Sequence, residues 1–184
     1  MFKINSRKLT EQEAILLVEN IKLITEITGY SLKEWLTFES VLVAEDREEN
    51  MLGVCLAYDF SSNWSFISVL FVLEEFRGNK ITKKLFKEIS EKLFKEACRK
   101  ILSRKRNVYT SSRNPVVIKM MKQLNFILFD TLYVLPQPFN KYKFDFLLRG
   151  IKWITSFYRM KELSRKYLKY KDKRKFVYGI KSYE

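Results

Sequence analysis

The pattern of apolar and polar positions predicts a strand and then a helix at the start of the chain. Residues 2–9, FKINSRKL, are expected to form the first strand. Thr10 and Glu13 form a capping box, a pair that marks a helix start, and apolar residues then recur at helical spacing. Gly29 is typical of a helix end, so the first helix is expected to run to that residue.

A second helix start and three strand-like runs follow. Ser31 and Glu34 form another capping box and open a short helix. SVLVAED (40–46) and MLGVCLAYDF (51–60) are joined by polar residues and are typical of a hairpin. The third run, SFISVLFVL (65–73), is almost continuously apolar, which predicts a central strand buried on both faces.

A polar turn, RGNK, separates this central strand from a long amphipathic helix. The helix has one apolar stripe, made by Leu85, Phe86, Ile89, Leu93, Phe94 and Ala97. A helix start offers unpaired N–H groups and the positive end of the helix dipole, so the turn could hold a phosphate group. RNVYTSS (106–112) then predicts a strand, and Asn114 with Pro115 predicts the start of another helix.

Length and composition favour one globular domain over residues 1–184, because 47% apolar residues suffice for one sizeable core. The sequence has neither a run of about twenty apolar residues nor an apolar stretch after the charged first residues. We therefore expect no membrane span and no secretion signal, and a cytoplasmic protein.

Residue counts restrict the chemistry. The chain has no histidine, which excludes imidazole catalysis and histidine-bound metals. Cys55 and Cys98 lie in a predicted strand and a predicted helix end, so we expect neither a disulfide nor a metal site. An acid or base must then be a carboxylate, tyrosine, thiol, lysine, backbone group or water.

Positive charge is concentrated at the C-terminus. Residues 139–184 contain fourteen Lys or Arg and four Asp or Glu, a net charge of +10, while the whole chain carries +14. This asymmetry favours a polyanionic partner, such as nucleic acid, an anionic surface or a phosphorylated cofactor. A solvated helical face explains it equally well.

The same region is expected to form a basic helical insertion (135–175) and a last strand (176–183). Two helical stripes, with a break expected near Gly150, are formed by Leu147, Ile151, Ile154 and Tyr158, and then by Met160, Leu163 and Tyr167. We expect these stripes to pack against a sheet or a second subunit, as in a homodimer, rather than to stack on nucleobases. Base stacking and contact with a membrane interface remain open.

This order of elements resembles the GNAT superfamily of acyl-CoA-dependent N-acyltransferases over residues 2–134. RGNKIT aligns with the turn that holds the pyrophosphate of coenzyme A in that family, and RNPVVIKMMKQLNF aligns with a later helix that typically begins NP. The resemblance implies an α/β (α+β) fold. Its centre would be a mixed, mostly antiparallel sheet of six or seven strands flanked by helices, with the C-terminal helices added to it.

The resemblance implies acetyl-CoA, or another acyl-CoA, as cofactor. Backbone N–H groups near the end of the central strand would polarise the thioester carbonyl. Lys80 and Thr82 stand where the family has small residues, and Thr82 brings a β-branch to the closest approach of the cofactor. The implied cofactor-binding residues are Phe71, Val72, Leu73, Arg77, Gly78, Asn79, Lys80, Ile81, Thr82 and Asn114.

The family's usual proton donor, a tyrosine seven residues after the Asn of NP, is replaced by Met121, which cannot donate a proton. Tyr109 or Tyr133 could protonate the thiolate instead, or the thiolate could leave to water, or catalysis could be lost. Glu74 is our first choice of base for the amine, with Glu75 and Asp59 as alternatives; each could equally be an ordinary surface acid.

Two functional hypotheses follow. One is an N-acyltransferase that moves an acyl group from acyl-CoA to an unknown amine by direct attack. The other is a catalytically inactive relative whose basic C-terminal segment binds nucleic acid or an anionic surface.

Overall fold

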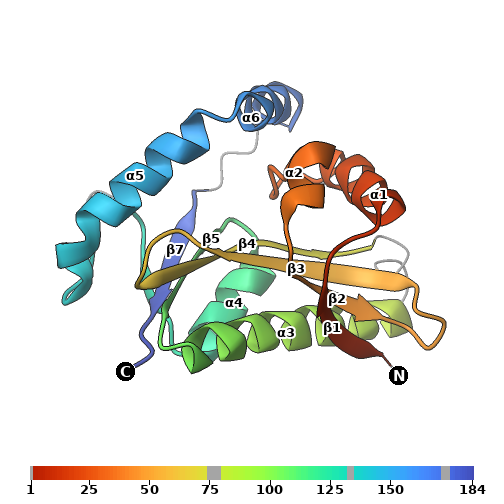
Figure 1. Ribbon diagram of the computed structural model, residues 1–184, viewed down its shortest axis with the longest axis horizontal. Helices are drawn as coiled ribbons and strands as arrows, with labels where there is room; N and C mark the ends of the chain where they lie inside the picture. Colours follow the sequence, from red (N-terminus) through yellow and green to blue (C-terminus); the bar gives the residue numbers. More distant parts are fainter. Residues whose placement is uncertain (1, 74–79, 132–134, 171–174) are drawn as a thin grey trace. The chain divides into compact units, whose positions relative to one another are not determined.

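The computed structural model describes residues 2–73, 80–131, 135–170 and 175–184 (Figure 1). Its strands form a seven-stranded sheet in the order β1-β2-β3-β4-β5-β7-β6. The strands are β1 (Lys3–Arg7), β2 (Val41–Glu45), β3 (Met51–Asp59), β4 (Trp64–Val72), β5 (Asn107–Ser112), β6 (Ile127–Phe129) and β7 (Val177–Lys181). The helices are α1 (Glu11–Lys22), α2 (Leu32–Thr37), α3 (Lys80–Ser103), α4 (Pro115–Gln123), the 3-10 helix η2 (Phe139–Tyr142), α5 (Lys143–Ile154) and α6 (Phe157–Tyr170).

The sheet and its flanking helices confirm the predicted α/β fold. Strands run antiparallel in the pairs β1/β2, β2/β3, β5/β7 and β7/β6. The last strand of the chain lies between β5 and β6. The chain divides into two compact units: residues 1–57 with 67–100, and residues 58–66 with 101–184.

In the first unit, α1 and α2 lie on one side of the strands and α3 on the other (Figure 1). Both predicted capping boxes are present, at Thr10 and at Ser31. The predicted stripe of α3 is also confirmed, because Ile89, Leu93 and Phe94 are fully buried. The core of this unit therefore lies between its helices and its strands.

The prediction that the first helix runs to Gly29 was wrong, since α1 ends at Lys22. Gly29 lies beyond the helix with φ = +77°, and a Cβ there would lie 2.7 Å from Cγ2 of Ile21. The chain therefore folds back onto the helix it has just left. Glycine is required at this position by both the backbone angle and the contact.

The core of the second unit is an aromatic cluster. Trp64 and Tyr109 are fully buried, and Phe139 and Phe146 nearly so. Trp64 packs edge-on against Phe139, Phe146 and Tyr142, with ring centroids 5.1–5.5 Å apart. The C-terminal helices thus join this core through the rings of η2 and α5.

The predicted C-terminal helices and last strand are present, but the predicted position of the break between the helices was wrong. The helical break lies at Thr155–Ser156 and not near Gly150, which is inside α5. The side chains of Leu147, Ile151 and Ile154 are exposed, so the described part of this chain does not cover them, and their packing against a second subunit stays a prediction. Helical periodicity identifies a stripe but does not say whether anything covers it.

Candidate functional site

The end of the central strand is buried and tightly held by its neighbour. Phe71 and Val72, the last residues of β4, are 1% exposed. A Cβ on Gly53 of β3 would lie only 2.6 Å from the carbonyl oxygen of Phe71. The N–H of Leu73 donates a hydrogen bond of 3.0 Å to the carbonyl oxygen of Leu52. In this arrangement the Leu73 N–H is already engaged, whereas a role of Phe71 and Val72 toward a thioester stays a prediction.

The predicted phosphate turn leads directly into α3. Glu74, Glu75, Arg77, Gly78 and Asn79 lie outside the described residues. Lys80, Ile81 and Thr82 form the backbone of the first turn of α3.

No acidic residue lies in that first turn, and Lys83 and Lys84 are exposed just after it. The N–H groups of a helix start, the dipole of a 24-residue helix and two lysines together suit a phosphate.

The NP motif starts a helix, as the sequence predicted. Pro115 is at the first helical position, and Oδ1 of Asn114 accepts a hydrogen bond of 2.9 Å from the N–H of Val116. The N–H of Asn114 in turn donates to Oγ of Ser112 at 3.0 Å. The Asn114 side chain is therefore used as a helix cap, and its part in cofactor binding stays a prediction.

Tyr109, one of the two candidate proton donors, is fully buried in β5. Its ring stacks on Phe66 at a centroid distance of 5.2 Å and meets Phe146 edge-on at 4.9 Å. Burial raises the pKa of the Tyr109 hydroxyl, and the positive charge of Arg149 acts in the opposite direction. The Ser111 side chain acts weakly on this pKa, but no described residue makes a hydrogen bond of regular geometry with the hydroxyl.

Arg149 of α5 lies against this tyrosine and was not singled out from the sequence. Its guanidinium carbon is 3.7 Å from the ring centroid of Phe66, 4.8 Å from that of Tyr109 and 5.8 Å from that of Phe60. Its Nε is buried and has no hydrogen-bond partner among the described residues. The cluster is thus a cation on three aromatic faces beside a buried hydroxyl, an arrangement that attracts an anion.

One signal in the sequence could have identified Arg149. It lies three residues after Phe146, so helical spacing places both side chains on the same face of α5. Because Phe146 is buried, that face is the inner one. A count of basic residues alone does not distinguish Arg149 from the thirteen other Lys and Arg residues of the C-terminal segment.

The other candidate groups do not join this cluster. Asp59, an alternative base, pairs with Arg104 at 3.2 Å and with Arg106 at 3.5 Å. The Asp59 carboxylate is thus held in ion pairs, and its role as a base stays a prediction. Tyr133, the second candidate proton donor, lies outside the described residues.

The described part of the chain offers neither a cluster of metal ligands nor a helix that could span a membrane. Its side chains contain no group of three or more metal-binding residues. Among its helices, none is both long and apolar enough to cross a membrane.

Two solved structures resemble the chain in fold. N-acetylglutamate synthase from Neisseria gonorrhoeae, solved with coenzyme A and N-acetyl-glutamate, has a TM-score of 0.60 and 12% identity over 100% of this chain. This chain spans 35% of the length of that protein. Rv2747 from Mycobacterium tuberculosis, solved in complex with CoA, has a TM-score of 0.57 and 12% identity, and the match covers 97% of this chain and 98% of that one.

Comparison at the sequence level gives the family. No curated protein matches the sequence. The model of the acetyltransferase (GNAT) family matches residues 14–126, more than half of the chain. This match includes the end of β4, the start of α3 and the NP helix, the elements that carried the resemblance. The chain therefore belongs to the GNAT family of acetyltransferases.

Proposed function

We propose that this protein transfers an acyl group, acetyl by analogy with its family, from acyl-CoA to the amine of an acceptor that carries a carboxylate. Membership of the GNAT family supports the acyl transfer. The observation that carries the acceptor class is the guanidinium of Arg149, which has no acidic partner among the described residues and lies beside the buried hydroxyl of Tyr109.

The residues at the start of α3 fit the cofactor. Coenzyme A carries a pyrophosphate, and a helix start with Lys83 and Lys84 nearby and no acid in its first turn is the donor set that this group needs. Arg77, Gly78 and Asn79 of the preceding turn would add to it. The two similar structures were both solved with coenzyme A.

The proposed reaction is direct attack of the amine nitrogen on the thioester carbon. The C–N bond forms, the C–S bond breaks, and the nitrogen loses a proton while the sulfur leaves as a thiolate. Glu74 would take the proton from nitrogen. Tyr109 or Tyr133 would protonate the thiolate, unless it leaves to water.

The burial of Tyr109 both favours and disfavours its role as the proton donor to the thiolate. Its raised pKa keeps the hydroxyl protonated at neutral pH, so a proton is available. The same burial makes the hydroxyl a weak acid. Arg149 offsets this weakness, because its positive charge stabilises the phenolate that remains after donation.

Arg149 would hold the carboxylate of the acceptor. The ionisable neighbours that act most on the pKa of Tyr109 are Arg149, Tyr178 and Tyr58, and none of these carries a carboxylate. A carboxylate that enters would pair with the guanidinium without displacing an acidic partner from the residues that the structure describes. The synthase from Neisseria gonorrhoeae was solved with N-acetyl-glutamate, an acylated amine that carries carboxylates.

The test compares matched acceptors. Calorimetry with acetyl-CoA and coenzyme A measures cofactor binding, and thiol release is then followed with free amino acids and with the corresponding amino-acid amides. We expect Arg149→Met to lower kcat/KM for the free acids about 100-fold, the value of one lost charge-assisted pair, and to leave the amides unchanged.

The controls separate chemistry from folding. Arg99→Met removes an exposed arginine that pairs with Glu96 and should change neither acceptor class. Equal losses for acids and amides in Arg149→Met would show that Arg149 only packs, and would contradict the acceptor class. An absence of cofactor binding at near-millimolar concentration would instead favour the inactive binding module.

A further inference from the structure

We propose that α5 and α6 form a docking surface for an anionic lipid membrane, independently of any catalytic role of the protein. The surface, called the α5–α6 apolar face, consists of Phe144, Leu147, Leu148, Ile151, Ile154, Phe157, Met160, Tyr167 and Leu168. These are nine of the sixteen exposed large hydrophobic side chains of the described residues, although the two helices contain only 26 residues. Exposed apolar side chains that gather in this way mark an interaction surface.

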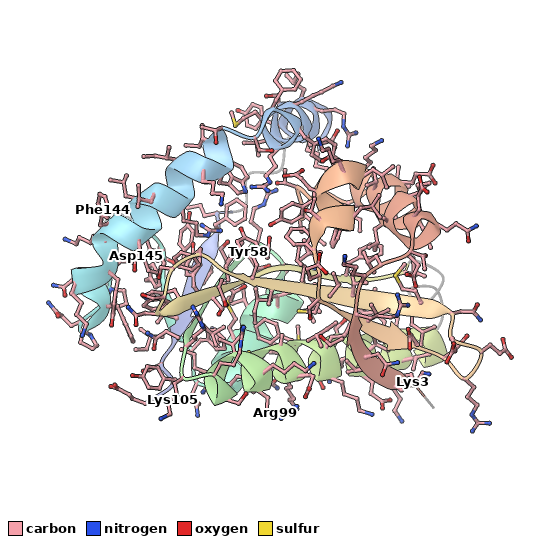
Figure 2. The ribbon with its side chains drawn as sticks, viewed as in Figure 1. Lys3, Tyr58, Arg99, Lys105, Phe144 and Asp145 are labelled. Atoms are coloured by element: carbon pink, nitrogen blue, oxygen red, sulfur yellow. The ribbon has the colours of Figure 1, made fainter. Side chains whose placement is uncertain are left out.

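On α5 the exposed side chains form one stripe. Phe144, Leu147, Leu148, Ile151 and Ile154 span an arc of about 120° at 3.6 residues per turn. Each of them is at least half exposed, from 50% for Leu148 to 66% for Phe144. Figure 2 shows Phe144 on the side of α5 turned away from the strands of its unit. Phe146 and Arg149 occupy the opposite, inner side of the helix.

Helix α6 also exposes large apolar side chains. Phe157, Tyr167 and Leu168 are 84%, 73% and 75% exposed. Its charged residues Glu162 and Lys166 are turned inward and are buried. Helix α6 thus exposes large apolar side chains while two of its charged side chains are buried, the reverse of what is usual for a helix in water.

The charges around this face are of one sign. In residues 139–168, the exposed charged side chains are Lys141, Lys143, Lys152 and Lys161. The two acids of this segment are less exposed than these lysines: Asp145 is half-buried, and Glu162 is buried and pairs with Arg165 at 2.7 Å.

The position of two lysines also fits a membrane. At about 100° per residue, Lys143 and Lys152 lie just outside opposite edges of the α5 stripe. Lysines at the edge of an apolar face can extend their amines to lipid headgroups while the face enters the acyl region. Anionic headgroups attract these amines in addition.

Other occupants suit the face less well. A second copy of the chain would bring the same lysines against each other. Nucleic acid would pair with the lysines but would leave the aliphatic stripe of Leu147, Ile151 and Ile154 without a partner. An anionic membrane is complementary to both the apolar and the charged side chains.

The test measures cosedimentation of the full chain with vesicles of phosphatidylserine and phosphatidylcholine, and with vesicles of phosphatidylcholine alone. The wild type should bind the anionic vesicles at least tenfold more tightly. The double variant Leu147→Ser/Ile151→Ser should lose at least tenfold in affinity at any salt concentration. Lys143→Glu/Lys152→Glu should lose the preference for phosphatidylserine.

Matched controls use exposed residues elsewhere. Leu23→Ser removes an equally exposed apolar side chain, and Lys95→Glu/Lys122→Glu reverses two exposed lysines. Both should bind like the wild type, and circular dichroism should show that all variants are folded. Equal binding of wild type and Leu147→Ser/Ile151→Ser would overturn the proposal. So would a dimer that dissociates in this variant without any vesicle binding, or binding to a DNA duplex but not to vesicles.

Discussion

Met121 and Gly179 are in such close contact that any side chain at position 179 would force the Met121 side chain to shift. A Cβ on Gly179 would lie 2.7 Å from Sδ of Met121, which is fully buried in α4. Strand β7 therefore packs directly on this helix. The position at which the family resemblance implies a catalytic tyrosine is a core position in this chain.

Met121→Tyr should consequently destabilise the protein instead of supplying an acid. The added ring overpacks the contact with Gly179, which typically costs about 1–3 kcal/mol. Urea denaturation measures the loss, and thiol release should not increase. Met121→Leu, which conserves volume, should cost less than about 1.5 kcal/mol. A stable tyrosine variant with higher turnover would show that the site has room for the ring.

Gly53→Ala should destabilise the first unit and weaken cofactor binding. The new Cβ would lie 2.6 Å from the carbonyl oxygen of Phe71, so β3 and the end of β4 must separate. We expect a lower urea midpoint and a higher Kd for coenzyme A in calorimetry. Gly150→Ala is the control, because no atom lies within 4 Å of its Cβ position, and it should be neutral or stabilise α5 by up to about 1 kcal/mol. If the affinity for coenzyme A is unchanged in Gly53→Ala, the end of β4 does not contribute to cofactor binding.

Arg7→Met should cost about 3 kcal/mol of unfolding free energy. Arg7 binds Glu13 through both terminal amines, at 2.6 and 2.8 Å, and donates through Nε to the buried Glu45 at 2.7 Å. Its loss leaves the buried Glu45 carboxylate with only Lys3, at 3.8 Å, as a cation. The value is at the low end for such changes because Lys3 remains and because 31% of the Arg7 side chain is exposed. Lys8→Met, which breaks an exposed pair with Glu39, should change stability by less than about 0.5 kcal/mol.

The same cluster predicts an acid dependence. Burial acts to raise the pKa of Glu13, but hydrogen bonds from Arg7 and Thr10 outweigh it and leave the pKa lowered. The folded state therefore binds this proton less readily than the unfolded state, and stability should fall as the pH drops below about 4.3. Urea midpoints measured from pH 6 to pH 3 should fall less steeply in Arg7→Met. Parallel slopes in the two proteins would contradict this.

Cys55 should be unreactive in the folded protein and should make folding sensitive to alkali. Burial raises the pKa of its thiol, and the nearby Cys98 adds to the effect. Unfolding releases a normal thiol, so stability should decline as the pH rises above about 8.5. Iodoacetamide should label Cys55 in urea but not in buffer, and Cys55→Ala should have a shallower alkaline slope. Rapid labelling of the native protein at neutral pH would show that the thiol is accessible.

Much of the fold follows from signals that are local in the chain. The capping boxes at Thr10 and Ser31 place helix starts correctly, because the side chain and the N–H that it caps are three residues apart. The stripe through Ile89 and Phe94 identifies the buried face of α3 for the same reason. Asn114 and Pro115 likewise mark the start of α4.

Other features depend on residues that are distant in sequence. Gly29 resembles a helix end, yet its need for glycine comes from its contact with Ile21 after the chain has turned back. Arg149 acquires its environment from Phe66 and Tyr109, which are 83 and 40 positions earlier. A pattern within one helix or strand cannot reveal contacts between residues so far apart in the sequence.

Local periodicity and paired caps were thus enough to establish the type and start of most elements, and with the RGNKIT and NP motifs they indicated the family. Tertiary packing alone decided which stripes are covered. It buried Met121 against Gly179, placed Arg149 on an aromatic cluster and left the outer side of α5 exposed. The physical reason is that hydrogen bonds within one element are set by neighbours in sequence, whereas burial is set by whatever the folded chain brings alongside.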